Sequence, residues 1–125
     1  MLKEAEIQTE FFKIIRDANF LHAYPEAKFI HAIPNGARVN IGQAVKLKKQ
    51  GLLSGVPDVF VPLPTFDHHG LYIEFKVPRG KLSQAQKEFS YHCDDYSYLH
   101  LVCYSARDAV AAVRKYLRHT RPEIR

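Results

Sequence analysis

The chain has 125 residues, of which 46% are hydrophobic, 25% charged and 12% aromatic. This length predicts one domain over residues 1–125, and the composition excludes an intrinsically disordered chain. The net charge of +5 favours an anionic partner, either nucleic acid or an acidic membrane surface. No apolar run approaches the roughly 18 residues of a membrane-spanning helix. Cys93 and Cys103 are the only cysteines, which is typical of a reducing compartment, so we expect a cytoplasmic protein with two buried thiols.

The first half of the chain predicts a helix, a short strand and a second helix. Apolar residues recur at helical spacing over residues 3–18, with charged residues between them. Residues 28–33 alternate as in a strand, and a Pro-Asn-Gly turn ends it at Gly36. A lysine-rich helix is expected over residues 42–50, because Gly51 follows where a helix favours a left-handed residue.

The second half predicts a hairpin followed by a helix, a strand and a last helix. The apolar run 59–61 and the strand 71–77 pair as the hairpin, and the second strand alternates an apolar core face with a charged face. Capping patterns at Ser83 and Ser105 start the two helices, with a strand over residues 98–104 between them. The order predicts an α/β domain with a mixed β-sheet flanked by helices.

The residues with the clearest chemistry are Asp58, Glu74 and Lys76. Asp58 begins the first hairpin strand, and the other two lie on one face of its partner, so the hairpin gathers all three on one side of the sheet. Two carboxylates supply the oxygen ligands that Mg²⁺ or Mn²⁺ takes beside water and phosphate, and the Phe75 carbonyl is a candidate third ligand. The Lys76 ammonium can orient an attacking water or stabilise developing charge. The pattern predicts phosphodiester hydrolysis.

Two sets of motifs carry a resemblance to known nucleases. Gly55-x-Pro-Asp58, Glu74-x-Lys76 and Gln86 resemble the PD-(D/E)xK nuclease superfamily. The runs IPNG, GVPD, GLYIEFK and RGKLSQAQ, together with the last helix, more narrowly resemble a phage-type stand-alone VRR-NUC domain.

The resemblance implies a single restriction-endonuclease-like domain, dependence on Mg²⁺ or Mn²⁺, and branched or junction DNA as the substrate. It implies a homodimer as well, since symmetric cutting of two strands needs two sites. The implied catalytic residues are Asp58, Glu74, Lys76, Gln86 and a glutamate of the first helix, Glu4, with Glu6 and Glu10 as alternatives.

The chain departs from the family pattern at one point. Val77-Pro78-Arg79 stands in place of the Val-Arg-Arg triplet, which leaves the role of Arg79 open.

Some of these residues have ordinary structural interpretations. Gln86 completes a capping box with Ser83, an interpretation as good as a role in the site. Glu4 lies in the first turn of a helix, where the helix dipole favours any carboxylate. Glu74 and Lys76 alone would form an exposed ion pair, and only the Gly-x-Pro-Asp segment at hairpin distance favours a site.

Two basic stretches without an acidic residue flank the carboxylates, residues 35–50 and residues 76–87. We expect these residues to contact DNA phosphates, and the alternative is that they are simply solvated lysines on a helix face. The predicted DNA-binding residues are Asn35, Arg38, Lys46, Lys48, Lys49, Arg79 and Lys81. The chain is therefore predicted to be a metal-dependent DNA endonuclease, and the alternative is a non-catalytic DNA-binding module on the same fold.

Overall fold

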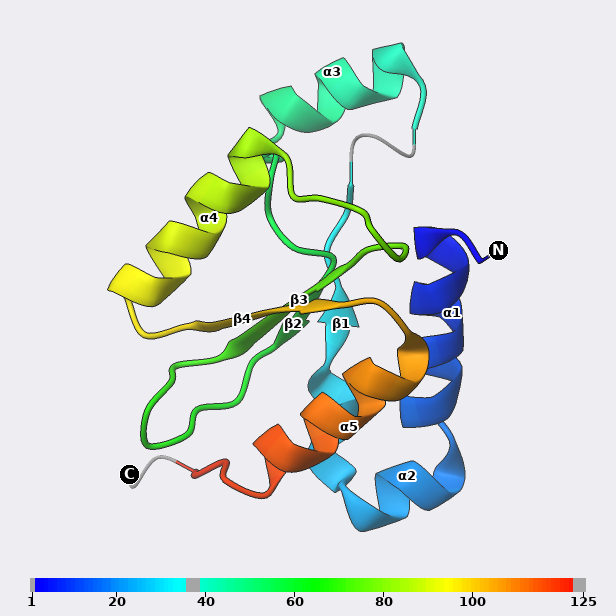
Figure 1. The fold of residues 1–125 in the computed structure, drawn as a ribbon, viewed down its shortest axis with the longest axis vertical. Coiled ribbons are helices and arrows are strands. Elements are labelled where there is room, and N and C mark those ends of the chain that lie inside the picture. The colour runs from blue at the N-terminus through cyan, green and yellow to red at the C-terminus, as the bar shows by residue number, and fades with distance from the viewer. Residues whose placement is uncertain (1, 36–38, 123–125) are drawn as a thin grey trace.

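The computed structural model describes residues 2–35 and 39–122. Over these residues the helices are α1 (Glu4–Ile15), α2 (Ala18–Ala23), the 3₁₀ helix η1 (Pro25–Phe29), α3 (Ile41–Lys49), α4 (Gln84–Asp95) and α5 (Ala106–Leu117). The strands are β1 (His31–Ala32), β2 (Val59–Val61), β3 (Leu71–Phe75) and β4 (Leu99–Cys103). Figure 1 shows the arrangement, which confirms the predicted α/β class.

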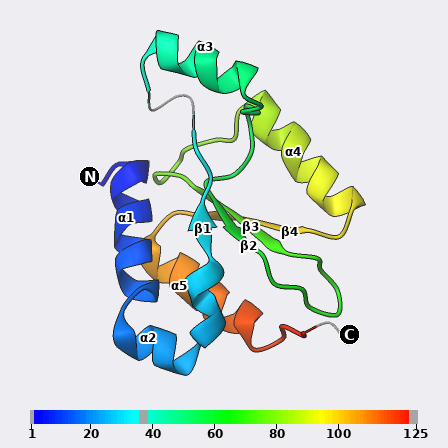
Figure 2. The same ribbon diagram turned by 180° about the vertical axis from the view of Figure 1, so that it is seen from behind.

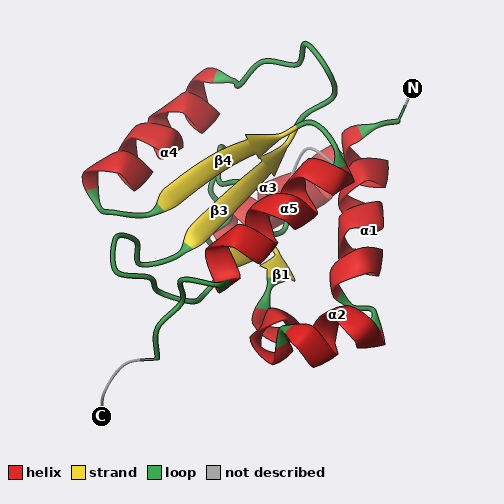
Figure 3. Ribbon diagram, turned by 60° about the horizontal axis from the view of Figure 1, so that its bottom comes forward, coloured by secondary structure: helices red, strands yellow, loops and turns green. Residues whose placement is uncertain are grey.

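The four strands form one mixed sheet in the order β1-β2-β3-β4. The first three strands pair antiparallel, whereas β3 and β4 run parallel and are connected through α4. Helices α1 and α5 pack on one face of the sheet and α4 lies on the other, as Figures 1 and 3 show. The domain therefore has three layers, with strands β3 and β4 between helices.

The core lies between the sheet and the pair α1 and α5. Alternate residues of β3 (Leu71, Ile73 and Phe75) are fully buried on this face. The Phe75 ring contacts the Phe11 ring of α1 with the ring centroids 5.4 Å apart. Burying such rings removes apolar surface from water and stabilises the position of α1 on β3.

The region after the first helix differs from the prediction. Helix α1 ends at Ile15 rather than at residue 18, and a second helix follows, with the Asp17 side chain accepting a hydrogen bond from the Asn19 N–H at its start. The predicted strand over residues 28–33 is reduced to β1, because Pro25 starts a 3₁₀ helix that runs through Phe29. Pro is favoured at such a start, since it has no N–H to leave unpaired.

The other predicted elements agree with the structure to within one or two residues. Strand β3 ends at Phe75 rather than at residue 77, so Lys76 follows the strand instead of belonging to it. Both thiols, Cys93 and Cys103, are buried as expected. No helix in the described part of the chain is long and apolar enough to cross a membrane.

Helix α3 stands apart from the sheet, close to the N-terminal end of α4, as Figure 2 shows from behind. None of its residues is buried, and three lysines occupy its last turn. Its ends are nevertheless well defined: the Asn40 side chain accepts a hydrogen bond from the Gln43 N–H, and Gly51 adopts a φ of 105° beyond the C-terminus. These caps stabilise α3, which lacks the buried residues that stabilise the other helices.

Candidate active site

The two predicted carboxylates meet across the antiparallel pair of strands. Val59 lies opposite Ile73, so Asp58, one residue before β2, reaches the position opposite Glu74. The Asp58 Oδ2 atom accepts a hydrogen bond from the Phe75 N–H at 2.8 Å. Asp58 is 3% exposed and Glu74 is 2% exposed. On the face of β3 that was expected to carry the charge, Glu74 is therefore buried, and Gln86 of α4 packs against it.

Burial of two carboxyl groups side by side has an electrostatic cost. The pKa of Glu74 is raised from 4.5 to about 8, first because burial disfavours its charged form and then because the Asp58 charge repels it. A side-chain hydrogen bond with Asp58 raises this pKa further, whereas Lys76 lowers it. The pair therefore retains a proton at neutral pH unless a further cation compensates it.

Lys76 and Gln86 both approach the same oxygen of Glu74. The Lys76 Nζ atom lies 3.9 Å from Glu74 Oε2, and its side chain is 13% exposed. The Gln86 Nε2 group donates a hydrogen bond to Glu74 Oε2 at 3.1 Å. Lys76 thus brings its charge to the edge of the site although it lies beyond the strand.

Gln86 also completes the capping box that starts α4. Its Oε1 atom accepts a hydrogen bond from the Ser83 N–H at 2.8 Å, and its own N–H donates to Ser83 Oγ at 3.2 Å. The two interpretations of Gln86 are therefore compatible, because the carbonyl oxygen serves the cap and the amide nitrogen serves Glu74. The cap fixes which end of the amide faces the site.

Among the three glutamates of α1, Glu4 is the one with an effect on the site. Its charge contributes to raising the pKa of Glu74. Glu6 and Glu10 instead line a shallow depression on α1 with Thr9 and Lys13. This electrostatic effect favours Glu4 over Glu6 and Glu10, and its role in the site stays a prediction.

The donor set suits a hard divalent cation. In the described residues no group of three or more His, Cys, Asp or Glu side chains is arranged to hold a metal ion, so the candidate ligands are the two carboxylates. The Phe75 carbonyl is the third candidate: its N–H points toward Asp58, and the C=O of a strand residue points to the same edge as its N–H. Burial first and the Asp58 charge second raise the pKa of Glu74, and a cation bound between the two carboxyls would oppose both effects.

A glycine fixes the approach of the Asp58 segment to α4. Gly55 has a φ of 93°, and a Cβ atom at this position would lie 2.5 Å from the backbone carbon and oxygen of Ala85. Only glycine allows the chain to pass this close to the first turn of α4. The glycine of the Gly-x-Pro-Asp motif therefore brings Asp58 and the Gln86 helix together, a role that the motif alone did not reveal.

Six of the seven predicted DNA-binding residues lie in the described part of the chain, and all six are exposed. Lys46, Lys48 and Lys49 lie on α3, and Arg79 and Lys81 lie on the connection between β3 and α4. Asn35 is exposed on the segment that leads toward α3, and Arg38 lies outside the described residues. His68 and His69 precede β3 and therefore lie at the opposite end of that strand from Lys76.

Arg79 occupies a strained backbone position in this connection. Its φ of 68° is in the left-handed region, and the Gly80 N–H donates to the Val77 carbonyl to close a tight turn. This turn position favours glycine or asparagine, so an arginine here costs free energy. The arrangement places a cationic side chain three residues from Lys76.

Comparisons with known proteins agree with this geometry. The model of the VRR-NUC domain family matches residues 6–107, and the chain belongs to this family. A solved structure described as a "VRR_NUC domain protein" superposes with a TM-score of 0.75 and 25% sequence identity, over 94% of this chain and 89% of the other. A search of curated proteins gives no match. Membership implies a nuclease-like fold that acts on DNA, as the resemblance of the motifs indicated.

Proposed function

We propose that this protein is a divalent-metal-dependent endonuclease that hydrolyses phosphodiester bonds of DNA, with branched or junction DNA as its preferred substrate. The observation that carries the proposal is the buried pair Asp58 and Glu74, with Lys76 and Gln86 both directed at Glu74. Membership of a nuclease family supports the same reaction class. Cytoplasmic action fits the two buried thiols.

The two carboxylates and the Phe75 carbonyl are proposed to hold Mg²⁺ or Mn²⁺. When bound, such an ion polarises the scissile phosphate and lowers the pKa of a coordinated water. Glu74 is held in place by Gln86, and Asp58 by the Phe75 N–H, so neither ligand has to move to bind. Preorganised ligands avoid a reorganisation cost during the reaction.

Lys76 is proposed to act on the reacting groups. Its ammonium lies beside the carboxylates and at the edge of the buried region, where a phosphate would enter. There it orients the attacking water and stabilises the negative charge that develops as the water oxygen bonds to phosphorus and the bond to the leaving sugar oxygen breaks. Glu4 is proposed to orient groups at the rim of the same site, since its charge helps to raise the pKa of Glu74.

The basic residues of α3 and of the β3–α4 connection are proposed to hold the DNA backbone. A homodimer belongs to the proposal as well, because one chain presents one carboxylate site and two strands are cut. Light scattering coupled to size-exclusion chromatography measures the mass in solution and tests this part independently of cleavage.

The experiment is a cleavage panel of junction, flap, nicked and linear duplex DNA with Mg²⁺, Mn²⁺ or EDTA. We expect cleavage with either metal, none with EDTA, and higher rates on branched DNA. Undiminished cutting in excess EDTA would exclude the metal mechanism. No cleavage of any substrate, with DNA binding retained, would make the chain a non-catalytic DNA-binding module.

Two variants distinguish the proposed metal-ligand role of Asp58 from the proposed phosphate contact of Lys76. Asp58→Asn and Lys76→Ala should both abolish cleavage, but they should change metal-free DNA binding in opposite directions. Without metal, the carboxyl pair has no cation between it and an incoming phosphate, and Asp58→Asn removes one of the two acidic groups, so binding tightens. Lys76→Ala removes a cation, so binding weakens. Gel-shift titrations in EDTA beside cleavage assays in Mg²⁺ measure both, and a wild-type rate in Asp58→Asn would refute the assignment.

A further inference from the structure

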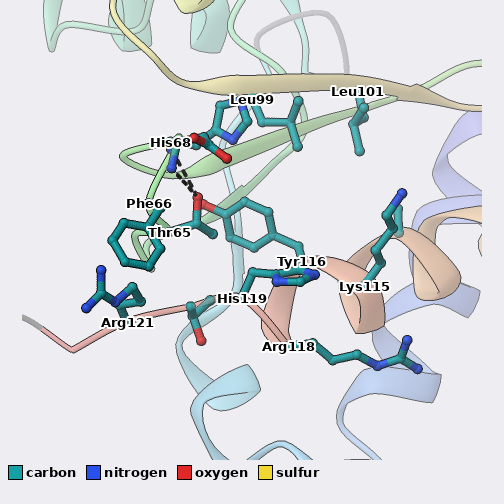
Figure 4. Close-up of a pocket in the computed structure, with 13 residues that line it drawn as sticks. Thr65, Phe66, His68, Leu99, Leu101, Lys115, Tyr116, Arg118, His119 and Arg121 are labelled. Carbon is teal, nitrogen blue, oxygen red and sulfur yellow. Dashed lines mark hydrogen bonds between the residues drawn. The ribbon is translucent and has the colours of Figure 1, made fainter.

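A second concave site lies on the face of the sheet opposite Glu74. It is a cavity of about 790 Å³ between β4, the C-terminal half of α5 and the loop that starts at Thr65, shown in Figure 4. Leu99 and Leu101 of β4 form its aliphatic wall and point toward α5. Leu101 lies beside Ile73 in the parallel ladder, and because side chains alternate along β3, Glu74 points to the other face.

The walls of this cavity are held in place by hydrogen bonds. The Tyr116 hydroxyl donates to the Leu63 carbonyl at 2.7 Å, which fixes its ring across the cavity. The Thr65 Oγ1 atom accepts from the His68 N–H at 3.0 Å, and the Arg121 N–H donates to the Pro64 carbonyl at 2.8 Å. The loop and the C-terminal segment are thereby tied together, so the cavity exists without a ligand.

The polar part of the lining is strongly biased toward positive charge. Lys115, Arg118 and Arg121 line the cavity with two histidines, and Asp67 is the one acidic residue in its described lining. Figure 4 shows the Lys115 side chain directed toward Leu101, whereas Arg121 lies below Phe66. An occupant that matches this lining has apolar groups beside negative charge.

The strand beside the cavity is at the edge of the sheet. In the described residues β4 pairs with β3 alone. The Leu99 N–H donates a hydrogen bond to the Gly70 carbonyl, and the Cys103 carbonyl accepts one from the Lys76 N–H. The N–H and C=O groups of the odd-numbered residues of β4 therefore point toward β3. The N–H and C=O groups of His100 and Val102 consequently point to the open edge, where an extended peptide can pair with them.

We propose that the edge of β4 and this cavity together bind an acidic peptide segment of another protein, in extended conformation. The peptide main chain pairs with His100 and Val102, alternate apolar side chains enter the cavity, and a flanking carboxylate meets Lys115, which is directed toward β4. This interaction is separate from the proposed cleavage, and most of the α5 residues involved lie beyond the family match, which ends at residue 107.

Charge and position favour a peptide over the other occupants. A second copy of the chain would bring the same cationic rim against itself at this surface. DNA held at Asp58 and Glu74 lies at the other end and on the other face of β3, and DNA has no main chain to pair with an open strand edge.

The test measures binding of a fluorescein-labelled peptide, Asp-Asp-Leu-Thr-Phe-Asp-Asp, to the full chain by fluorescence anisotropy. We expect saturable binding that weakens with salt, and a loss of about tenfold in affinity for Lys115→Glu. Lys13→Glu makes the same charge change on the exposed side of α1 and should alter affinity by less than about twofold. A peptide N-methylated at Leu and Phe cannot form the strand pairing and should bind at least about tenfold more weakly.

Several outcomes would overturn the proposal. They are no saturable binding up to about 1 mM peptide, equal affinity for a version with Lys in place of Asp, equal losses in both charge variants, or displacement of the peptide by single-stranded DNA. A dimer that dissociates in Lys115→Glu would assign the surface to a second copy instead. Cleavage of DNA by Lys115→Glu should equal that of the wild type, so failure here leaves the nuclease proposal unaffected.

Discussion

Glu74 is the residue at which burial, charge and ligand binding meet. Its pKa of about 8 means that the folded, metal-free protein holds a proton that the unfolded chain releases near pH 4.5. Between these two values the native state binds more protons than the unfolded state, so its stability falls as pH rises. The contribution of Glu74 is fully favourable below pH 4.5 and is lost by about pH 8.

This titration can be measured without any substrate. In EDTA, we expect the melting temperature of the wild type to fall between pH 5 and pH 8.5 more steeply than that of Glu74→Gln, whose neutral amide does not titrate. Mg²⁺ or Mn²⁺ should stabilise the wild type most at the alkaline end, where Glu74 has lost its proton. Thermal unfolding followed by circular dichroism gives the slopes.

Glu88→Gln is the matched control, because Glu88 is exposed on α4 and the change in charge is the same. The melting temperature of Glu88→Gln should fall with pH as steeply as that of the wild type. If the melting temperature of Glu74→Gln fell as steeply as that of the wild type, a group other than Glu74 would titrate in this pH range.

Single residues also show what the sequence could and could not reveal. The spacing of Asp58 and Glu74 predicted their meeting, because strand alternation and hairpin pairing follow directly from sequence order. The burial of Glu74 was not predictable, since a charged residue on an alternating strand normally faces water. Its burial depends on where α4 lies, and that is set by a contact of Gly55 with Ala85 across about thirty residues.

At the scale of elements, the first turn of α4 contains both the cap that stabilises the helix and a residue that contacts Glu74. The Ser83 hydroxyl accepts the Gln86 N–H, and the Gln86 side chain returns to the Ser83 N–H while its nitrogen reaches Glu74. Ser105 caps α5 in a similar way through the Asp108 N–H, but this cap involves neither Gln86 nor Glu74. The two serines therefore form a natural comparison.

Ser83→Ala and Ser105→Ala should each destabilise the protein by about 1 kcal/mol, since both remove an N-cap hydroxyl. Only Ser83→Ala should also reduce cleavage at saturating metal, because the Gln86 amide loses part of what orients it toward Glu74. Urea unfolding and single-turnover cleavage of both variants test this. Equal cleavage by the two variants would confine the Ser83 cap to helix stability.

The elements themselves were predicted best where periodicity and caps agree. The two capping patterns located α4 and α5, and the apolar stripe located α1. The region over residues 16–33 was wrong because α2 and η1 are short and nearly continuous in sequence with their neighbours. A six-residue helix has too little periodicity to recognise, although Asp17 at its start was a usable capping signal.

At the scale of the whole molecule, one group of cationic side chains lies around the end of the sheet that bears the two carboxylates. Helix α3 carries lysines but buries no residue, so the domain core does not need it in this position. An exposed cationic helix beside a carboxylate site suits a surface that binds a polyanion.

Replacing Lys48 and Lys49 together by Gln should weaken binding to all DNA sequences alike. The slope of log affinity against log salt should fall by up to ~0.9 for each lost phosphate contact. Cleavage at saturating DNA should change little, because neither lysine touches the carboxylates. Lys13→Gln with Lys28→Gln removes the same charge elsewhere and should have a smaller effect. Unaltered affinity with collapsed turnover would place the substrate on another surface.

The contact between the first and the last helix has a consequence for the order of events during synthesis. Helices α1 and α5 pack together although about a hundred residues separate them in the chain. The β2–β3 hairpin and the cap of α4 are local and form early, whereas this contact closes the longest loop and forms late. Helix α1 carries Glu4 and packs Phe11 against the strand that bears Glu74. We therefore expect a nascent chain whose α5 has not yet left the ribosome to lack the packing that holds α1 on the sheet, so the proposed activity should require the C-terminal helix.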